Sequence, residues 1–230
     1  MKLRPRYLDL VIFDCDGVLV DSEMLSAGVL MGMMAEVGLP ITPEIFRADF
    51  LGRSFGAAAA RAEQRFGRPL PDGFQSRYRE RLLAKMADEL KPMPGVVDLL
   101  VRLRTSYCLA TSSSPERLRL SLSVTGLAPF FEGRSFTASE VERGKPAPDL
   151  FLHAARLMGV EPARCIVIED SEMGVRAALA AGMAAWHFTG GAHVKAGYRL
   201  PADVLPDRSI ASMVELGVAL CELGLGQQAG

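Results

Sequence analysis

The sequence has little that would direct the protein to a nucleic acid or a membrane. Its 26 lysines and arginines face 27 aspartates and glutamates, a net charge of −1, so no broad electrostatic attraction to a polyanion is expected. No apolar stretch approaches the length of a membrane span, and Asp9 interrupts the N-terminal segment where a signal peptide would need its apolar region. We therefore predict a cytoplasmic protein that binds neither nucleic acids nor membranes.

Cysteine is also sparse, and its spacing argues against a metal site or a disulfide framework. No C-x-x-C pair occurs, and three of the four cysteines lie in or beside apolar runs; the four are Cys15, Cys108, Cys165 and Cys221. This is typical of small buried hydrophobic residues in a reducing compartment. Acidic neighbours on both sides of Cys15 disfavour its thiolate, so we do not expect it to be a nucleophile.

What is present is an alternation of apolar runs and amphipathic segments. Strands are predicted at Leu8–Phe13, Tyr107–Ala110, Cys165–Ile168 and Ala184–Phe188, with a weaker one at Ala202–Leu205. Helices are predicted near Gly95–Thr105, Pro115–Val124, Pro148–Met158, Ser171–Ala181 and Ile210–Leu223. Continuous apolar strands separated by helices indicate an α/β fold with a doubly wound parallel sheet, covered on both faces.

One region breaks the alternation. From about Ser22 to Leu90 the sequence contains helical patterns and no convincing strand, and the Pro/Gly-rich segment Lys91–Gly95 closes it. We therefore predict two domains, a core of residues 1–20 and 92–230 and an inserted all-helical domain of residues 21–91.

Acidic residues follow the first predicted strand. In open parallel sheets, ligands bind beyond the carboxyl ends of the strands. Asp14 and Asp16 stand two residues apart there, so on an extended backbone their side chains lean to the same side. A solvated acidic turn is the alternative, but acids packed against a buried strand are costly unless they are paired or bind a metal.

A second acidic pair, Glu169 and Asp170, follows the strand at Cys165–Ile168. In isolation it could be an acidic helix N-terminus ahead of Ser171. Together with the first pair it makes four carboxyl groups at one edge, which need a cation. Ligands that are all oxygen select a hard ion, and we predict Mg²⁺.

Hydroxyl groups follow the strand at Tyr107–Ala110. Ser114 and Pro115 suit a helix start, but Thr111 stands earlier, at the strand tip. Its hydroxyl and the following backbone N–H groups could hold a phosphate oxygen, so we predict phosphate binding by Thr111, Ser112 and Ser113.

Lysine is rare, with five residues against 21 arginines, and Lys145 stands in a "GKPAPD" segment. A surface position for it is the alternative. An ammonium group facing a metal–carboxylate cluster would neutralise a phosphoryl group together with the ion.

These residues together predict phosphoryl transfer. Asp14, nearest the strand, would attack phosphorus and form an aspartyl-phosphate. We expect a like-charged neighbour to raise the pKa of Asp16, so that Asp16 protonates the leaving oxygen and then activates water. A non-enzymatic receiver domain also phosphorylates an aspartate at a strand end, but such a domain has no helical insert and no acid placed like Asp16.

In these four clusters the sequence resembles the haloacid dehalogenase-like phosphohydrolases. "DCDGVLVDSE" is similar to the first motif of that family, and the other three motifs correspond to Thr111 in "LATSSS", Lys145 in "GKPAPD" and "IEDS" at 168–171. The resemblance covers nearly the whole chain and implies a Rossmann-like core with a helical cap. It also implies Mg²⁺ held by Asp14, the Asp16 carbonyl and Asp170, with Glu169 helping directly or through water.

The subfamily follows from departures within these motifs. Asp16 argues against dehalogenases, and the absence of a lysine just after the first motif argues against phosphonatase. β-Phosphoglucomutase carries a histidine where this chain has Ser26. We predict a Mg²⁺-dependent phosphomonoester hydrolase acting on a small phosphorylated metabolite, a sugar or polyol phosphate; a β-phosphoglucomutase-like phosphosugar mutase is the alternative. The first motif is most similar to those of bacterial phosphatases near 6-phosphogluconate phosphatase.

Three further expectations concern less distinctive features. Arg53, after a glycine in a loop of the helical insert, could reach an anionic substrate, although a solvated arginine is equally compatible. His153, His187 and His193 are interpreted as structural. The family resemblance implies a monomer, with a weak homodimer as the alternative.

Overall fold

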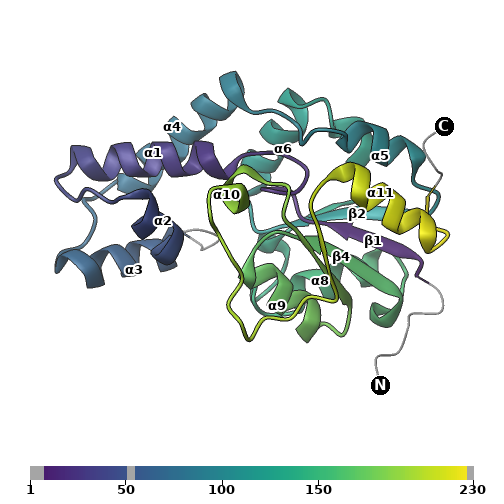
Figure 1. Cartoon of the computed structure of the whole chain (residues 1–230). Coiled ribbons are helices and arrows are strands. Elements are labelled where there is room, and N and C mark those ends of the chain that lie inside the picture. The colour runs from purple at the N-terminus through teal and green to yellow at the C-terminus, as the bar shows by residue number, and fades with distance from the viewer. Residues whose placement is uncertain (1–7, 51–54, 227–230) are drawn as a thin grey trace.

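A six-stranded parallel sheet forms the centre of the molecule. The structure is a computed structural model that describes residues 8–50 and 55–226. The strand order is β3-β2-β1-β4-β5-β6, with all neighbours parallel (Figure 1). The strands are β1 (Leu10–Phe13), β2 (Ser106–Thr111), β3 (Ser135–Thr137), β4 (Cys165–Glu169), β5 (Ala184–Phe188) and β6 (Arg208–Ile210). The predicted parallel sheet is confirmed.

Helices cover both faces of this sheet, which explains why the strands read as continuous apolar runs. Val11 and Phe13 of β1 point into one hydrophobic core, while Leu10 and Ile12 point into the other, and all four are fully buried. The first core lies under α5 (Val96–Arg102), α6 (Pro115–Val124) and α11 (Met213–Glu222), and the second under α8 (Asp149–Leu157) and α9 (Glu172–Ala180) (Figure 1). Two one-turn helices, α7 (Ala128–Phe131) and α10 (Ala192–Lys195), also belong to this part of the chain.

Between β1 and α5 the chain forms an all-helical insert. It consists of α1 (Glu23–Glu36), α2 (Pro43–Asp49), α3 (Phe55–Phe66) and α4 (Phe74–Glu89), which lie to one side of the sheet (Figure 1). These helices bury a hydrophobic cluster of their own, which includes Met34, Phe46 and Phe74. The predicted α/β fold with a helical insert is therefore confirmed.

The two connecting segments that join the insert to the sheet run side by side. Val20 and Pro92 form an antiparallel bridge. The backbone N–H of Met93 donates to the carbonyl of Leu19 at 2.8 Å, and the N–H of Asp21 donates to the carbonyl of Lys91 at 3.2 Å. The entry and exit of the insert are thus held together.

The prediction of a last strand at Ala202–Leu205 was wrong. Residues 202–205 form a turn and irregular chain, and the edge strand β6 lies a few residues later. Pro201 and Pro206 flank the predicted segment, and a proline cannot donate a hydrogen bond to a strand ladder. Of the apolar residues of this segment, Val204 packs into the core without strand pairing.

One helix boundary differs from the prediction, and one strand was not predicted. The predicted helix at Ile210–Leu223 begins at Met213, because Ser212 caps it by accepting a hydrogen bond from Glu215 N–H and Ile210 belongs to β6. Strand β3 was not predicted, since its three residues are too few to give a periodic signal.

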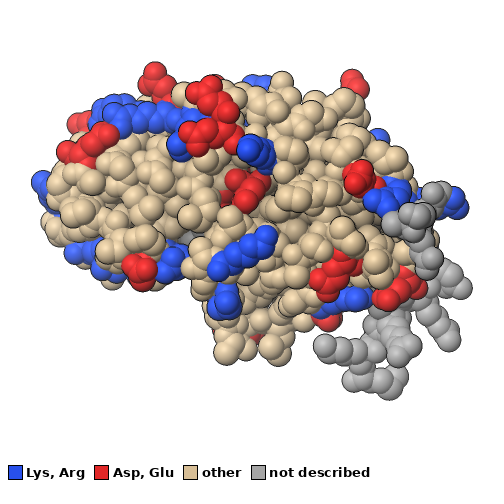
Figure 2. All heavy atoms as spheres, turned by 45° about the horizontal axis from the view of Figure 1, so that its top comes forward, with Lys and Arg blue, Asp and Glu red and all other residues tan. Residues whose placement is uncertain are grey.

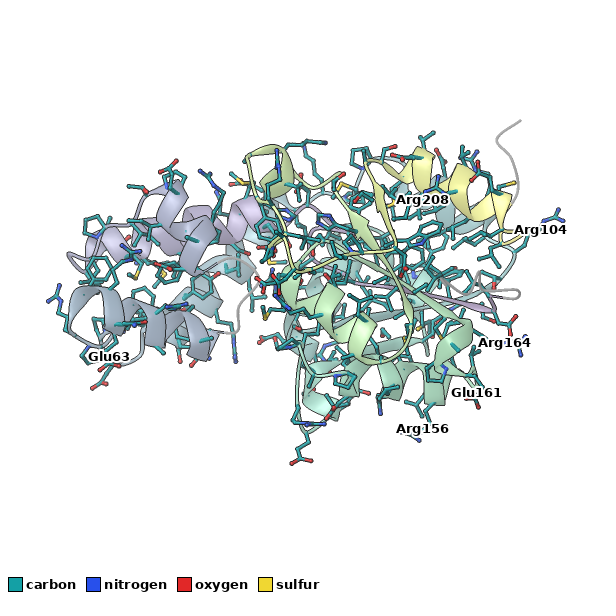
Figure 3. All side chains as sticks on the ribbon, turned by 60° about the horizontal axis from the view of Figure 1, so that its bottom comes forward. Glu63, Arg104, Arg156, Glu161, Arg164 and Arg208 are labelled. Carbon is teal, nitrogen blue, oxygen red and sulfur yellow. The ribbon has the colours of Figure 1, made fainter. Side chains whose placement is uncertain are left out.

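The surface carries charges of both signs. Acidic and basic side chains alternate over the face shown in Figure 2, in agreement with a net charge of −1. Figure 3 places Glu63 of α3 and Arg104, beyond α5, at opposite ends of the molecule, with the sheet between the insert and the far end. Within the described ranges no helix combines the length and the apolar composition needed to cross a bilayer.

Candidate active site

The carboxyl ends of three central strands bring the predicted residues together. Phe13 pairs with Ile168 of β4 and with Leu109 of β2, so the residue after β1 lies level with the ends of its neighbours. Asp14 N–H donates to the carbonyl of Ile168 at 3.0 Å, which fixes the backbone of Asp14 next to Glu169. The strand order reverses at β1, which creates a crevice at the carboxyl ends of the strands. Doubly wound folds bind their ligands in a crevice of this kind.

Lys145 connects two of the acidic positions. Its Nζ lies 2.6 Å from Asp14 Oδ1 and 2.7 Å from Glu169 Oε1, and it also donates to the carbonyl of Ala110 at 3.1 Å. The ammonium lies over the ring of Phe151, 4.7 Å from its centroid. Burial alone would lower the pKa of Lys145, but the two carboxylates outweigh it and raise that pKa, so the side chain is charged.

Asp14, Glu169 and Asp170 form a buried group that could hold a metal ion. Each offers an oxygen, and these atoms lie within 4.8 Å of one another. Burial raises the pKa of Asp14 well above its usual range, against the opposing effect of Lys145, and burial with the charge of Glu169 does the same for Asp170. Three crowded carboxylates with one ammonium leave negative charge uncompensated, and a divalent cation fits that deficit.

Glu169 differs from its two neighbours. Burial acts to raise the pKa of Glu169, but Lys145 and hydrogen bonds from Ser171 outweigh it and lower that pKa. The N–H and the hydroxyl of Ser171 both donate to Glu169 Oε2 at 2.9 Å. The end of β4 therefore holds one carboxylate by fixed hydrogen bonds.

Asp16 is separate from this group and faces a residue that the sequence reasoning did not identify. Arg117 Nη2 donates to Asp16 Oδ1 at 2.6 Å, while the hydroxyls of Ser22 and Ser113 donate to the two carboxylate oxygens at 2.5 Å. Burial would raise the pKa of Asp16, but Arg117 and these hydrogen bonds outweigh it and lower the pKa. Our expectation of a raised pKa at Asp16 was wrong, and it is Asp14 whose pKa is raised.

Arg117 also touches the helical insert. It stands in the first turn of α6, after the cap formed by Ser114, and its Nη2 lies 3.3 Å from the hydroxyl of Ser26 on α1. The sequence carried a signal for it: Ser114 and Pro115 predict a helix that starts at the strand ends, so the first turn of that helix borders the site.

The three predicted phosphate-binding hydroxyls lie in different settings. Thr111 is buried at the end of β2, and its Oγ1 accepts from the N–H of Ser113 at 3.1 Å. Ser112 is exposed and lines the cavity, whereas the hydroxyl of Ser113 is directed at Asp16.

A cavity of about 370 Å³ lies between the strand ends and the insert. The sheet side contributes the acids, Lys145 and the Thr111 loop, while the insert contributes an apolar and aromatic wall that includes Leu30, Phe55 and Tyr78. Glu23, Gln75 and Arg79 add polar groups on that side. Arg53 lies outside the described residues.

Glycine is required at two positions beside the acids. A Cβ on Gly17, which has φ +77°, would lie 1.8 Å from Asp170 Oδ2, and one on Gly174 would lie 1.7 Å from Glu169 Oε1. Both carboxylates thus occupy space that any larger residue would fill.

Comparisons with known proteins match most of this chain. The model of the haloacid dehalogenase-like hydrolases matches residues 8–182. The chain is 27% identical to a 6-phosphogluconate phosphatase of Escherichia coli, over 82% of this chain and 86% of that protein, and 31% identical to a fructose-1-phosphate phosphatase of the same organism, over 77% and 94%. A crystal structure of a hydrolase of the same family from Deinococcus radiodurans, with bound phosphate and sodium, has a TM-score of 0.78 at 34% identity and covers 96% of this chain and 99% of that one.

Proposed function

Because this chain belongs to the haloacid dehalogenase-like hydrolases, we propose that it hydrolyses phosphomonoesters of small phosphorylated metabolites with Mg²⁺, through an aspartyl-phosphate intermediate. The observation that carries the proposal is the contact of Lys145 Nζ with Asp14 Oδ1 at 2.6 Å, at the carboxyl end of β1. An ammonium beside a strand-end carboxylate suits a nucleophile that meets a phosphoryl group.

The first step assigns the attack to Asp14. A carboxylate oxygen of Asp14 forms a bond to phosphorus while the bond from phosphorus to the leaving oxygen breaks, and Asp16 gives a proton to that oxygen. Lys145 neutralises charge on the phosphoryl oxygens as the phosphoryl group passes from the leaving oxygen to Asp14. Thr111 and the N–H groups of the loop after it, with Ser112, bind the remaining phosphoryl oxygens.

The second step returns the enzyme to its starting form. Asp16, now ionised, takes a proton from a water molecule that attacks phosphorus, and the bond between phosphorus and the Asp14 oxygen breaks. Inorganic phosphate leaves. In the described arrangement Arg117, Ser22 and Ser113 favour the ionised form of Asp16, which is the form that acts as the base in this step. The acid role in the first step requires Asp16 to take up a proton before the leaving oxygen departs.

The acidic group fits Mg²⁺. All its side-chain ligands are oxygens, and Asp170 has no lysine or arginine within ion-pair distance among the described residues. We infer that Asp14, the carbonyl of Asp16 and Asp170 hold the ion, with Glu169 contributing directly or through water. When bound, Mg²⁺ would neutralise phosphoryl charge and favour the ionised form of Asp14.

We further propose that residues 21–91 act as a cap over the cavity, on a core of residues 1–20 and 92–230. The separate hydrophobic cluster of the insert and the paired chain at Val20 and Pro92 support this division. A cap of this kind would exclude water from the leaving-group side and contact the substrate there.

The substrate we propose is a sugar or polyol phosphate. The names of the relatives support this class, and the cavity wall contributes hydrogen-bonding groups at Glu23, Gln75 and Arg79 beside its apolar residues. A phosphosugar mutase would need an activating bisphosphate, so release of inorganic phosphate without one distinguishes the two reactions.

The test is phosphate release from a panel of sugar phosphates and from an aryl phosphate, with Mg²⁺ and with EDTA. We expect turnover with Mg²⁺, loss with EDTA, recovery on adding Mg²⁺ back, and loss in Asp14→Asn. Asp9→Asn is the matched control, because Asp9 precedes the opposite end of β1 and pairs with Arg164. Full turnover in EDTA or in Asp14→Asn would contradict the mechanism.

A further inference from the structure

Two buried histidines hold Asp170 at different atoms. His187, near the end of strand β5, has its Nε2 3.0 Å from the backbone carbonyl of Asp170. His193, on α10, has its Nε2 3.1 Å from Asp170 Oδ2. Both side chains are almost fully withdrawn from solvent. Of the carboxylates in the metal-capable group, Asp170 is the one whose fixed partners are imidazoles.

The surroundings of His193 determine which nitrogen carries its proton. Nδ1 is buried and has no hydrogen-bond partner within the described residues. A neutral imidazole has one donor and one acceptor nitrogen, and a buried N–H without an acceptor is costly. The proton therefore belongs on Nε2, which lies 3.1 Å from Asp170 Oδ2.

The ring of His193 is held in place on several sides. It packs against Tyr198, with ring centroids 5.6 Å apart, and a Cβ on Gly17 or on Gly191 would come within 3.1 Å of its Cε1. The N–H of Ala192 on the same helix donates to Asp21 Oδ1 at 3.2 Å, which ties α10 to the chain at the base of the insert. The orientation of the ring, and with it the direction of the Nε2–H group, is thus fixed by packing.

We propose that His193 is a positioning residue for the divalent cation. By donating to one oxygen of Asp170, it orients the carboxylate and leaves the second oxygen available to the ion. Ligating carboxylates elsewhere depend on such partners, whose loss weakens metal binding. This role rests on the Mg²⁺-dependent function proposed above.

The test measures Mg²⁺ binding directly, by isothermal titration calorimetry of the full chain without substrate. Three variants separate donor from packing: His193→Gln places an amide N–H near the position of Nε2, His193→Asn places one near the position of Nδ1, and His193→Leu keeps apolar bulk without a donor. His153→Asn is the matched control, since His153 lies on α8 and bonds Glu140 away from the acidic group. Thermal unfolding in EDTA checks that each variant is folded.

We expect the Kd for Mg²⁺ to rise about 10–100-fold in the Asn and Leu variants, with most of the affinity kept in His193→Gln and all of it in His153→Asn. Wild-type affinity in folded His193→Leu would overturn the role. Equal weakening in Gln, Asn and Leu would overturn it as well, because packing alone would then be responsible. A wild-type chain that binds no Mg²⁺ would overturn the metal-dependent function and, with it, this role.

Discussion

The guanidinium of Arg117 lies 2.6 Å from the carboxylate of Asp16, although 101 residues separate them in the sequence. The two acids of the first motif therefore have different cations: Lys145 stands at Asp14 and Arg117 at Asp16. Because α6 carries Arg117 and α1 carries the Ser26 that it also contacts, the acid proposed to handle protons lies where the core meets the helical insert.

Replacing Arg117 by methionine should change the pH dependence of catalysis. Arg117 lowers the pKa of Asp16, so its removal from a buried site raises that pKa. A step that needs protonated Asp16 fails as pH rises through its pKa, so the limb on which activity falls should move to higher pH in Arg117→Met. The pH profile of kcat/KM reports this shift.

The control for this variant is Arg119→Met, which removes an exposed arginine from the same helix. We expect its profile to superimpose on that of the wild type. If the profile of Arg117→Met did so too, Arg117 would have no influence on the proton-transferring group.

The loss of kcat/KM in Asp16→Asn should depend on the leaving group of the substrate, whereas the loss in Asp14→Asn should not. A general acid matters most where the departing oxygen is basic, so an alkyl phosphate such as a sugar phosphate should lose about 10²–10⁴-fold in kcat/KM. With an aryl phosphate whose phenol is acidic, kcat/KM should fall less, because the departing oxygen needs less protonation in the first step. Comparing both substrates in both variants checks the division of roles, and equal losses would contradict it.

Much of the site could be predicted because strand ends are recognisable in the sequence. Asp14, Thr111 and Glu169 each follow or end an apolar run, and parallel pairing brings such ends to one edge whatever the loops do. The comparisons with known proteins confirm the predicted family, fold class and phosphatase-type enzyme.

The contacts that could not be predicted join side chains that lie far apart in the sequence, and they depend on the direction in which each side chain points. The pairing of Asp16 with Arg117 requires the phase of α6 relative to β1, which no local pattern contains. The expected direction of the Asp16 pKa shift was therefore wrong, since it considered a like-charged neighbour and not the arginine that outweighs it. The position of His193 over Asp170 likewise depends on how a loop after β5 folds back.

Lys145→Met should destabilise the protein, and more so at higher pH. In the wild type, the lowered pKa of Glu169 contributes stability that is present above the unfolded pKa and lost as pH falls through the folded pKa. Without Lys145, burial raises the pKa of Glu169 above its unfolded value, so the folded state loses stability as pH rises. We expect a loss of about 3–5 kcal/mol near pH 8, as for a buried charge left without its partner, and a smaller loss near pH 5.

Urea unfolding in EDTA at both pH values measures this difference. The control is Lys85→Met on α4, where the lysine is partly exposed and pairs with Glu89 at 2.7 Å. Exposed pairs contribute about 0–1 kcal/mol, so little change is expected there at either pH. A loss in Lys145→Met that did not vary with pH would show that the carboxylates remain ionised without the lysine.

Gly174→Ala should disrupt the site, although it adds one methyl group on a helix. The new Cβ would lie 1.7 Å from Glu169 Oε1, so Glu169 must leave its hydrogen bonds with Lys145 and Ser171. We expect a destabilisation of about 1–3 kcal/mol, from overpacking a buried site, and a weaker Kd for Mg²⁺. Gly28→Ala on α1 makes the same change where nothing lies within 4 Å, and it should stabilise the protein by about 0.5–1 kcal/mol through helix propensity. Opposite signs for two identical substitutions would separate the effect on Glu169 from the effect on the helix, and stabilisation by both would mean that Glu169 moves aside without cost.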